Sequence, residues 1–335
     1  GPGLLLPPEP GAAPAGRSTA PRAAAADADT CPTFSLANRD SLRICMIRVD
    51  FRTDHSGDST TTPDGKFDLR TDVPAPVDPA PHNRHFYEMH LEALKRFYEA
   101  QSSNHLHITG TVFPVQPDSA FHLSDTADYG PWAVTSDAVT VDVAAQAERL
   151  IKDSLEQARR SGQVDFNAFD AFIIVHAGAD FQSDINGDSP RDIPTFVLEF
   201  AEPFRVDGKL ICRTMVLPET TTQDESFGAL NSVLAHEFGH ILGLWDLYNV
   251  RNGVPMVGLW SLMDSGTNLP AILVDPTDES EVAAFGVLPP SFDAWSRLQL
   301  WGGSFLAAQL DVVEDTLTTR LESVIPSSRL ALVDI

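Results

Sequence analysis

The segment HEFGHILGLWD at residues 236–246 constrains the fold of this chain more than any other feature. His236 and His240 are four residues apart, so on a helix their imidazoles lie on one face, about 6 Å apart. At that spacing two ring nitrogens can bind one zinc ion, each at about 2.0–2.1 Å. Glu237 lies about 100° around the helix from His236 and can reach a metal-bound water without binding the metal itself. The segment therefore predicts a helix that carries a zinc site.

The residues after the second histidine predict a third zinc ligand. Gly243 allows the chain to leave the helix through a turn with positive φ, and Asp246 can then return toward the metal. Two histidines and one carboxylate leave one zinc position open, as catalytic zinc requires. Asp264 is the alternative carboxylate, and a structural helix with two surface histidines is the alternative for the whole motif.

A second motif, GLWSLMDSG at residues 258–266, contains Met263 in a predicted tight turn. A methionine turn beneath the zinc site is the Met-turn of metzincin peptidases, whereas an ordinary core methionine is the alternative. Together the motifs predict hydrolysis of a peptide bond, in which Glu237 takes a proton from the attacking water and delivers it to the leaving amine. A zinc hydrolase of another amide or ester, and a latent or non-catalytic zinc-holding module, stay open as alternatives.

These motifs resemble the immune inhibitor A family of secreted zinc metallopeptidases. The resemblance extends over residues 40–302 through the segments RICMIRVDF, FDAFIIVHAG, MVLPETTTQD and LPPSFDAWSRLQLWG. It implies a metzincin-like zincin domain, secretion, His236 and His240 as zinc ligands, and Glu237 as the catalytic acid and base. The pattern HExxHxxGxxD then implies Asp246 as third ligand, in place of the third histidine of most metzincins.

One position departs from the metzincin pattern. Some metzincins have a tyrosine two residues after the methionine of the Met-turn, and Ser265 stands there in this chain. Tyr248 is therefore the candidate hydroxyl for support of the oxyanion, and a packing role is its alternative.

Apolar strand-like runs alternate with amphipathic helical segments before residue 228, and two further helical segments follow. The strand-like runs are 42–51, 105–115, 169–175 and 210–217, and the helical segments are 84–102, 142–160, 228–244 and 292–300. This alternation predicts an α/β (α+β) domain with a mixed twisted sheet and packed helices. Residues 244–290 are predicted to form a loop-rich lower subdomain that contains the Met-turn.

Composition divides the chain into three parts. Residues 1–33 are rich in Ala, Pro and Gly, and a segment with so few large apolar residues cannot bury enough surface to fold, so we expect a disordered tail or a propeptide remnant. Residues 34–302 are the predicted catalytic domain. Residues 303–335 alternate weakly and predict the start of a C-terminal β module.

The net charge of −24 restricts the binding partners of the chain. It argues against a nucleic-acid binder, which needs a basic face, and against an anionic membrane surface. No run of 18 apolar residues exists, so we expect no membrane span. We expect a monomer that acts on protein or peptide substrates.

A calcium loop is a weaker prediction. Asp184, Asn186, Asp188 and Asp192 place oxygen ligands at offsets 1, 3, 5 and 9, but the glutamate expected at position 12 is absent. Calcium is therefore one interpretation of this segment, and a solvated acidic turn is the other.

The three cysteines form at most one disulfide. Cys45 and Cys212 lie in apolar strand-like runs, where a cysteine behaves as a small buried hydrophobe. Cys31 lies at the edge of the tail, and its thiolate could bind the zinc in a latent form; an unremarkable or disulfide-bonded cysteine is the alternative.

Overall fold

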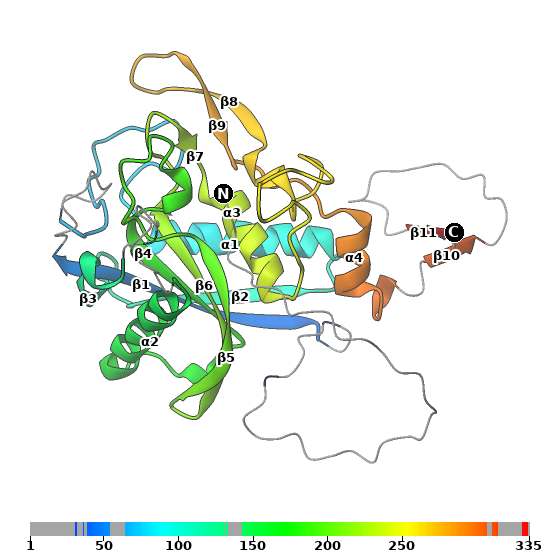
Figure 1. Ribbon diagram of the computed structural model, residues 1–335, viewed down its shortest axis with the longest axis horizontal. Helices are drawn as coiled ribbons and strands as arrows, with labels where there is room; N and C mark the ends of the chain where they lie inside the picture. The colour runs from blue at the N-terminus through cyan, green and yellow to red at the C-terminus, as the bar shows by residue number, and fades with distance from the viewer. Residues whose placement is uncertain are drawn as a thin grey trace.

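The computed structural model describes residues 31, 36, 39–53, 64–130, 132 and 143–306, and the backbone of 310–313 and 330–333. The predicted tail therefore lies almost wholly outside the described residues, as does most of the predicted C-terminal module. Figure 1 shows a mixed sheet with helices on both of its faces. The α/β fold class predicted from the sequence is confirmed at this level.

Six strands form the main sheet, in the order β2-β1-β4-β6-β5, with β3 beside the second half of β1. All neighbours are parallel except β5 and β6, which are antiparallel, so the sheet is mixed as predicted. The strands are β1 (Ser41–Thr53), β2 (His107–Phe113), β3 (Phe121–Asp125), β4 (Ala171–Ala179), β5 (Phe196–Val206) and β6 (Lys209–Thr220).

Four α-helices lie within the described residues, close to where the sequence predicts them: α1 (Arg84–Gln101), α2 (Val143–Ser161), α3 (Leu230–Ile241) and α4 (Ala294–Trp301). Strand β1 shows how they cover the sheet, because successive side chains of a strand point to opposite faces. Leu42, Ile44 and Met46 pack in the cluster with α1 and α3, whereas Cys45 and Ile47 pack in the cluster with α2. The middle of the strand is a continuous apolar run, Ile44–Ile47, because both faces of the sheet are covered.

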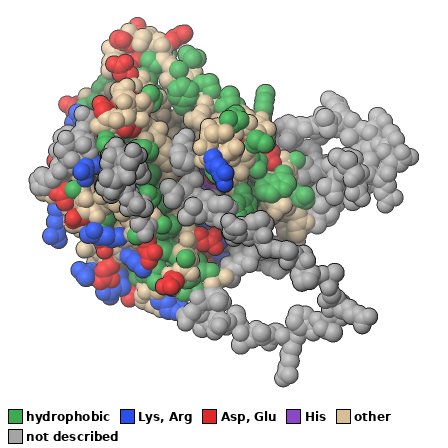
Figure 2. All heavy atoms as spheres, viewed as in Figure 1, with side chains coloured by type: hydrophobic (Ala, Val, Ile, Leu, Met, Phe, Trp, Pro, Cys, Tyr) green, Lys and Arg blue, Asp and Glu red, His purple; other side chains and the backbone are tan. Residues whose placement is uncertain are grey.

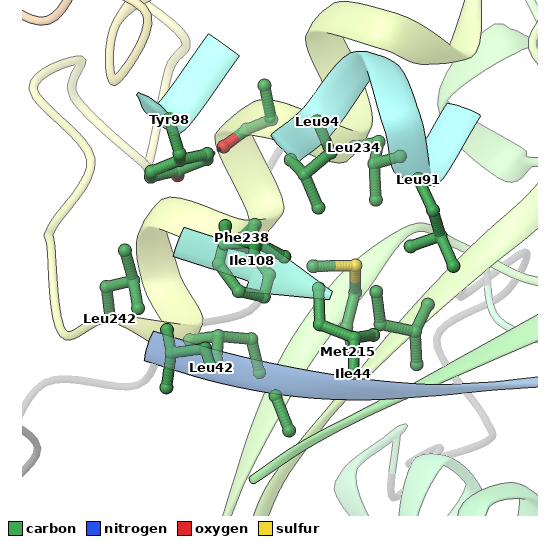
Figure 3. Close-up of a cluster of buried hydrophobic side chains, with 14 of the residues drawn as sticks. Leu42, Ile44, Leu91, Leu94, Tyr98, Ile108, Met215, Leu234, Phe238 and Leu242 are labelled. Atoms are coloured by element: carbon green, nitrogen blue, oxygen red, sulfur yellow. Dashed lines mark hydrogen bonds between the residues drawn. The ribbon is translucent and has the colours of Figure 1, made fainter. Parts of the chain in front are cut away.

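Helix α3 is fixed on the sheet by an apolar layer. Figure 3 shows sheet residues such as Ile44 and Met215 facing Leu234 and Phe238 of α3, with side chains of α1 beside them. The hydroxyl of Tyr98 on α1 donates to the backbone oxygen of Ala235, at 2.9 Å. This apolar layer and the hydrogen bond from Tyr98 therefore hold α3 against the sheet.

Strands β3 and β5 were not predicted from the sequence. Strand β5 reads FVLEFAEPFRV, and its interior charges and Pro203 break the alternation that identifies strands. The structure accommodates Pro203 because β5 is at the edge of the sheet and its pairing with β6 shifts register between Glu199 and Phe204.

A small second sheet occupies part of the segment predicted as loop-rich. β7 (Phe227–Gly228), β8 (Pro270–Val274) and β9 (Glu281–Phe285) pair in the order β7-β9-β8. Residues 227 and 228 belong to this sheet and not to α3, which is why the helix begins later than predicted. Much of the remaining segment between α3 and α4 is irregular, as expected.

Short elements complete the described chain. They are the 3-10 helices η1 (Thr126–Asp128), η2 (Phe166–Ala168), η3 (Phe181–Ser183) and η4 (Ser265–Asn268), and the parallel pair β10 (Leu310–Val313) and β11 (Leu330–Val333). Figure 2 shows exposed hydrophobic side chains in the upper part of the view, toward the β8–β9 hairpin, where Ile272 and Val274 are exposed. Within the described residues, no helix combines the length and apolar character needed to cross a membrane.

Candidate metal centre

Helix α3 carries both histidines of the predicted zinc motif. His236 and His240 are one helical turn apart and buried, with ring centroids separated by 4.8 Å. Their Nε2 atoms are 3.1 Å apart. The four-residue spacing thus brings the two nitrogens to one point, as the sequence predicts.

Asp246 reaches the same point through the predicted turn. Gly243 adopts φ +93°, so the chain reverses just after α3. Asp246 Oδ1 then lies 3.1 Å from His236 Nε2 and 3.3 Å from His240 Nε2. The structure therefore brings the three predicted ligands together.

The outer nitrogens of both imidazoles are held by backbone carbonyls. His236 Nδ1 donates to the oxygen of Leu262 at 2.7 Å, and His240 Nδ1 donates to the oxygen of Leu244 at 2.9 Å. Because a carbonyl oxygen only accepts, each Nδ1 carries the proton and each Nε2 presents a lone pair to the centre. Carbonyl partners of this kind orient histidine ligands in metal sites.

This donor set fits zinc. Ligand atoms at 2.0–2.1 Å from a tetrahedral zinc lie about 3.3 Å from one another, close to the separations of 3.1–3.3 Å in this cluster. Both carboxylate oxygens of Asp246 are buried without a hydrogen-bond partner. Three potential ligand atoms that converge in the protein interior are well placed to bind a cation between them.

The titration of the cluster also indicates stabilised positive charge. Burial acts to lower the pKa of His240, but its contact with Asp246 and the charge of Glu237 outweigh burial and raise this pKa to about 9. Burial acts to raise the pKa of Asp246, and the two imidazoles outweigh it and lower this pKa well below its ordinary value.

Glu237 is buried beside the cluster. Its Oε2 has no hydrogen-bond partner, and burial is the main reason that its pKa is raised. Glu237 and His236 line a cleft of about 460 Å³, whose other walls include Asp180, Tyr248 and Phe285. A buried carboxyl group with a free oxygen is therefore available at the cleft next to the metal ligands.

Met263 packs directly against α3 between the two histidines. Its side chain is fully buried, and a Cβ added at Gly239 would lie only 2.6 Å from Met263 Sδ. The same turn supplies the Leu262 oxygen that holds His236 and the Met263 oxygen that accepts from Leu247 N at 2.7 Å. The turn thus contacts both the helix and the chain that carries Asp246.

The alternative carboxylate, Asp264, has a different environment. Its Oδ2 accepts from three successive backbone nitrogens, those of Met256, Val257 and Gly258, and Oδ1 accepts from Ser265. It does not join the cluster of His236, His240 and Asp246. Asp264 instead organises the loop at the rim of the cleft.

Tyr248, the candidate oxyanion group, lines the cleft beside the cluster. Its ring lies 6.4 Å from that of His236 and nearly parallel to it, at 21°. This position is compatible with both the functional and the packing interpretation of Tyr248.

Two of the four predicted calcium residues come together with one that was not predicted. Asp184, Asp188 and Asp224 bring carboxylate oxygens within 4.8 Å of one another. Asn186 contributes its backbone nitrogen to Asp224 Oδ2, at 2.9 Å, and Asp192 accepts from the side chain of Gln223. The β5–β6 hairpin separates Asp224 from Asp184 and Asp188 in the sequence, so no local spacing could identify Asp224 as their neighbour.

The cysteines require one correction. Cys31 and Cys212 form a disulfide, so Cys212 is not a free buried thiol. The same bond bears out the disulfide-bonded alternative for Cys31 over a zinc-binding thiolate. Cys45 is the buried free cysteine that the sequence predicts, and burial raises the pKa of its thiol. Cys212 is half-buried on β6, and its partner Cys31 is far away in the sequence, so the local apolar pattern could not reveal the disulfide.

The comparisons with known proteins agree with this geometry. Residues 209–287 match the family model described as the catalytic domain of immune inhibitor A peptidase M6, whereas a search of curated proteins finds no match. The matched segment runs from β6 through α3 into β9 and contains His236, Glu237, His240 and Asp246. The match supports the resemblance to the immune inhibitor A family over these residues, and it supports a metallopeptidase.

Proposed function

We propose that the chain is a secreted zinc endopeptidase that hydrolyses peptide bonds with Glu237 as general base. The observation that carries the proposal is the convergence of His236 Nε2, His240 Nε2 and Asp246 Oδ1 beside a buried carboxyl group at an open cleft. Three protein ligands plus an open position are characteristic of catalytic zinc, whereas structural zinc sites have four protein ligands.

His236, His240 and Asp246 would hold the ion. When bound, zinc lowers the pKa of a coordinated water and polarises the carbonyl of the scissile bond. Glu237 accepts the proton of the attacking water and delivers it to the leaving amine. Burial, which raises the pKa of Glu237, suits this exchange because a carboxyl group whose pKa is nearer neutrality both accepts and returns a proton efficiently.

Two further residues support the site. Tyr248 can direct its hydroxyl to the oxyanion that forms on the substrate carbonyl. Met263 acts as the Met-turn of a metzincin-like domain: it packs under the ligand histidines, and its turn orients His236.

The cleft suits an extended protein or peptide segment. It runs between the loop that follows β4, with Asp180 and Ile185, and the second sheet, with Phe285. An extended chain can lie in such a cleft along neighbouring strands. We expect the protein to act as a monomer, and the Cys31–Cys212 disulfide supports an oxidising, extracellular location.

Calcium binding by Asp184, Asp188 and Asp224 stays a prediction. Three carboxylates are suitable oxygen ligands, and their mutual repulsion would fall when a cation binds. We expect millimolar calcium to raise the melting temperature of the wild type but not that of Asp224→Ala; an equal rise in both would argue for the solvated acidic turn.

The decisive experiment compares cleavage of an unfolded protein substrate by the wild type, Glu237→Ala and Asp246→Asn, with zinc content measured in each. We expect Glu237→Ala to keep its zinc and to lose about 10²–10⁴-fold in kcat/KM, the usual contribution of general acid–base catalysis. We expect Asp246→Asn to lose zinc, whereas Asp264→Asn keeps it.

The other outcomes separate the alternatives. Equal cleavage by the wild type and Glu237→Ala would mean that Glu237 is not the base. A wild type that holds zinc and cuts esters or small amides but no protein would be a hydrolase of another class. A wild type that holds zinc and cuts neither would be latent or a binding module.

A further inference from the structure

Helix α3 bears the metal ligands but has no cap of its own at its start. The residue at its N-cap position is Ala229, whose side chain makes no hydrogen bond. The first backbone nitrogens of a helix have no partner within the helix and must find one elsewhere. A helix of 12 residues is also marginal in isolation, so its position depends on what holds its ends.

Asp78 holds the first turn from a distant part of the chain. Its Oδ2 accepts from the backbone nitrogen of Leu230 at 2.8 Å, across 152 residues of sequence. The backbone oxygen of Gly286 accepts from Ser232 N at 3.0 Å on the same turn. A carboxylate at this end is favourable because the N-terminus of a helix carries partial positive charge.

Asp78 is itself fixed in place. Its backbone oxygen accepts from His82 Nε2 at 3.0 Å, and His82 Nδ1 pairs with Glu219 at the end of β6, at 2.7 Å. Its Oδ1 lies 3.7 Å from His90 Nε2 on α1. The acceptor for the helix start is thus tied to both the sheet and a neighbouring helix.

Arg213 on β6 holds the opposite end. Its Nη1 donates to the backbone oxygens of Ile241, at 3.1 Å, and His240, at 3.3 Å. Its other nitrogen, Nη2, lies 3.3 Å from Glu199 on β5. A positive side chain at this end complements the partial negative charge of the helix C-terminus.

We propose that Asp78 and Arg213 are positioning residues that clamp α3 at its two ends and thereby set the two histidines against Asp246. Asp78 and Arg213 contact only backbone atoms of α3 and none of the ligand side chains, so each acts through the helix. The inference rests on the proposed zinc binding by His236, His240 and Asp246. It assigns a role in the site to two charged residues that lie far from the motif in sequence.

The experiment measures zinc affinity of the full chain by competition with a chromophoric chelator. We expect Asp78→Ala and Arg213→Ala each to weaken zinc binding about tenfold, comparable to the loss of a helix cap. Asp78→Asn keeps an acceptor oxygen and Arg213→Lys keeps a charged donor, so both should stay within about twofold of the wild type. Two matched controls should leave the zinc affinity unchanged. They are Asp72→Ala, which alters an exposed aspartate, and Arg96→Ala, which alters an arginine on the surface of α1.

Amide hydrogen exchange supplies a second readout that reports which end is released. Asp78→Ala should speed exchange in the first turn of α3, and Arg213→Ala should speed it in the last turn. Alanine variants that melt at lower temperature but bind zinc as the wild type does would show a merely structural role and overturn the proposal. So would conservative variants that lose as much affinity as the alanine variants.

The proposed endopeptidase activity and the proposed clamp on α3 can be contradicted independently of each other. Both readouts are made without substrate, so a wild type that binds zinc and cuts nothing would contradict the endopeptidase but not the clamp. A wild type that binds no zinc would contradict the proposed function, and the exchange pattern would still test whether the two residues hold α3.

Discussion

His176, within β4, illustrates at the residue scale how burial controls charge. Its ring is buried, Nδ1 donates to the oxygen of Ala177 at 2.9 Å, and Nε2 has no partner. Burial lowers its pKa to about 4. The side chain is a core histidine that stays neutral in the folded protein, and it does not line the cleft.

Because His176 is buried, we expect the free energy of unfolding of the protein to depend on pH. An unfolded histidine titrates near pH 6.5 and the folded one near 4, so between these values the unfolded chain binds more protons than the folded one. The contribution of His176 is therefore complete above pH 6.5 and is lost as the pH falls to 4, by up to about 3 kcal/mol.

The free energy of unfolding, measured from pH 7 to pH 4 for the wild type and His176→Gln, tests this expectation. The variant should lose less stability than the wild type over that range. Parallel curves would mean that His176 is protonated or solvated in the folded protein.

At the scale of elements, the site depends on the contact between α3 and the turn at Met263. Gly239 lies between the two histidines, and the absence of a side chain there lets the buried Met263 approach the helix. A glycine in a helix interior ordinarily weakens the helix relative to alanine. Close packing against Met263 is the reason for this glycine.

We therefore expect Gly239→Ala to destabilise the protein by about 1–3 kcal/mol, although the same change stabilises most helices. The added Cβ would overlap Met263 Sδ and push the turn away from the helix. Thermal unfolding of the single variants and of Gly239→Ala with Met263→Ala measures the coupling. Strictly additive effects would show that the two side chains do not compete for space.

At the scale of the whole molecule, one covalent link joins distant parts of the chain. The Cys31–Cys212 disulfide connects the start of the described chain to β6, across a sequence separation of 181 residues. A long closed loop restricts the unfolded chain strongly, because many conformations are removed. Residue 212 is also next to Arg213, which holds the end of α3.

Removal of this disulfide in Cys31→Ser with Cys212→Ser should lower the free energy of unfolding by about 2–5 kcal/mol. Thiol titration provides the control, since the folded wild type should show no reactive thiol and the unfolded, unreduced chain should show one, Cys45. Two or more thiols in the unreduced chain would mean that the disulfide does not form.

Most of the features that could be predicted from the sequence depend on the spacing of residues that are close together in the chain. His236, Glu237, His240 and Asp246 come together because helix geometry and one glycine turn act over only eleven residues, so their proximity could be predicted without knowledge of the rest of the chain. The buried strands of the parallel sheet were also predictable, because two covered faces require a nearly continuous apolar run, as in β1.

Tertiary structure alone decided how distant segments meet. Asp78 and Arg213 lie at the ends of α3, Asp224 joins Asp184, and Cys31 pairs with Cys212 only because the tertiary fold brings these segments together. It also decided that Asp264 binds backbone nitrogens and not the cluster. No pattern of neighbouring residues encodes such contacts, since each depends on packing between elements that are far apart in sequence.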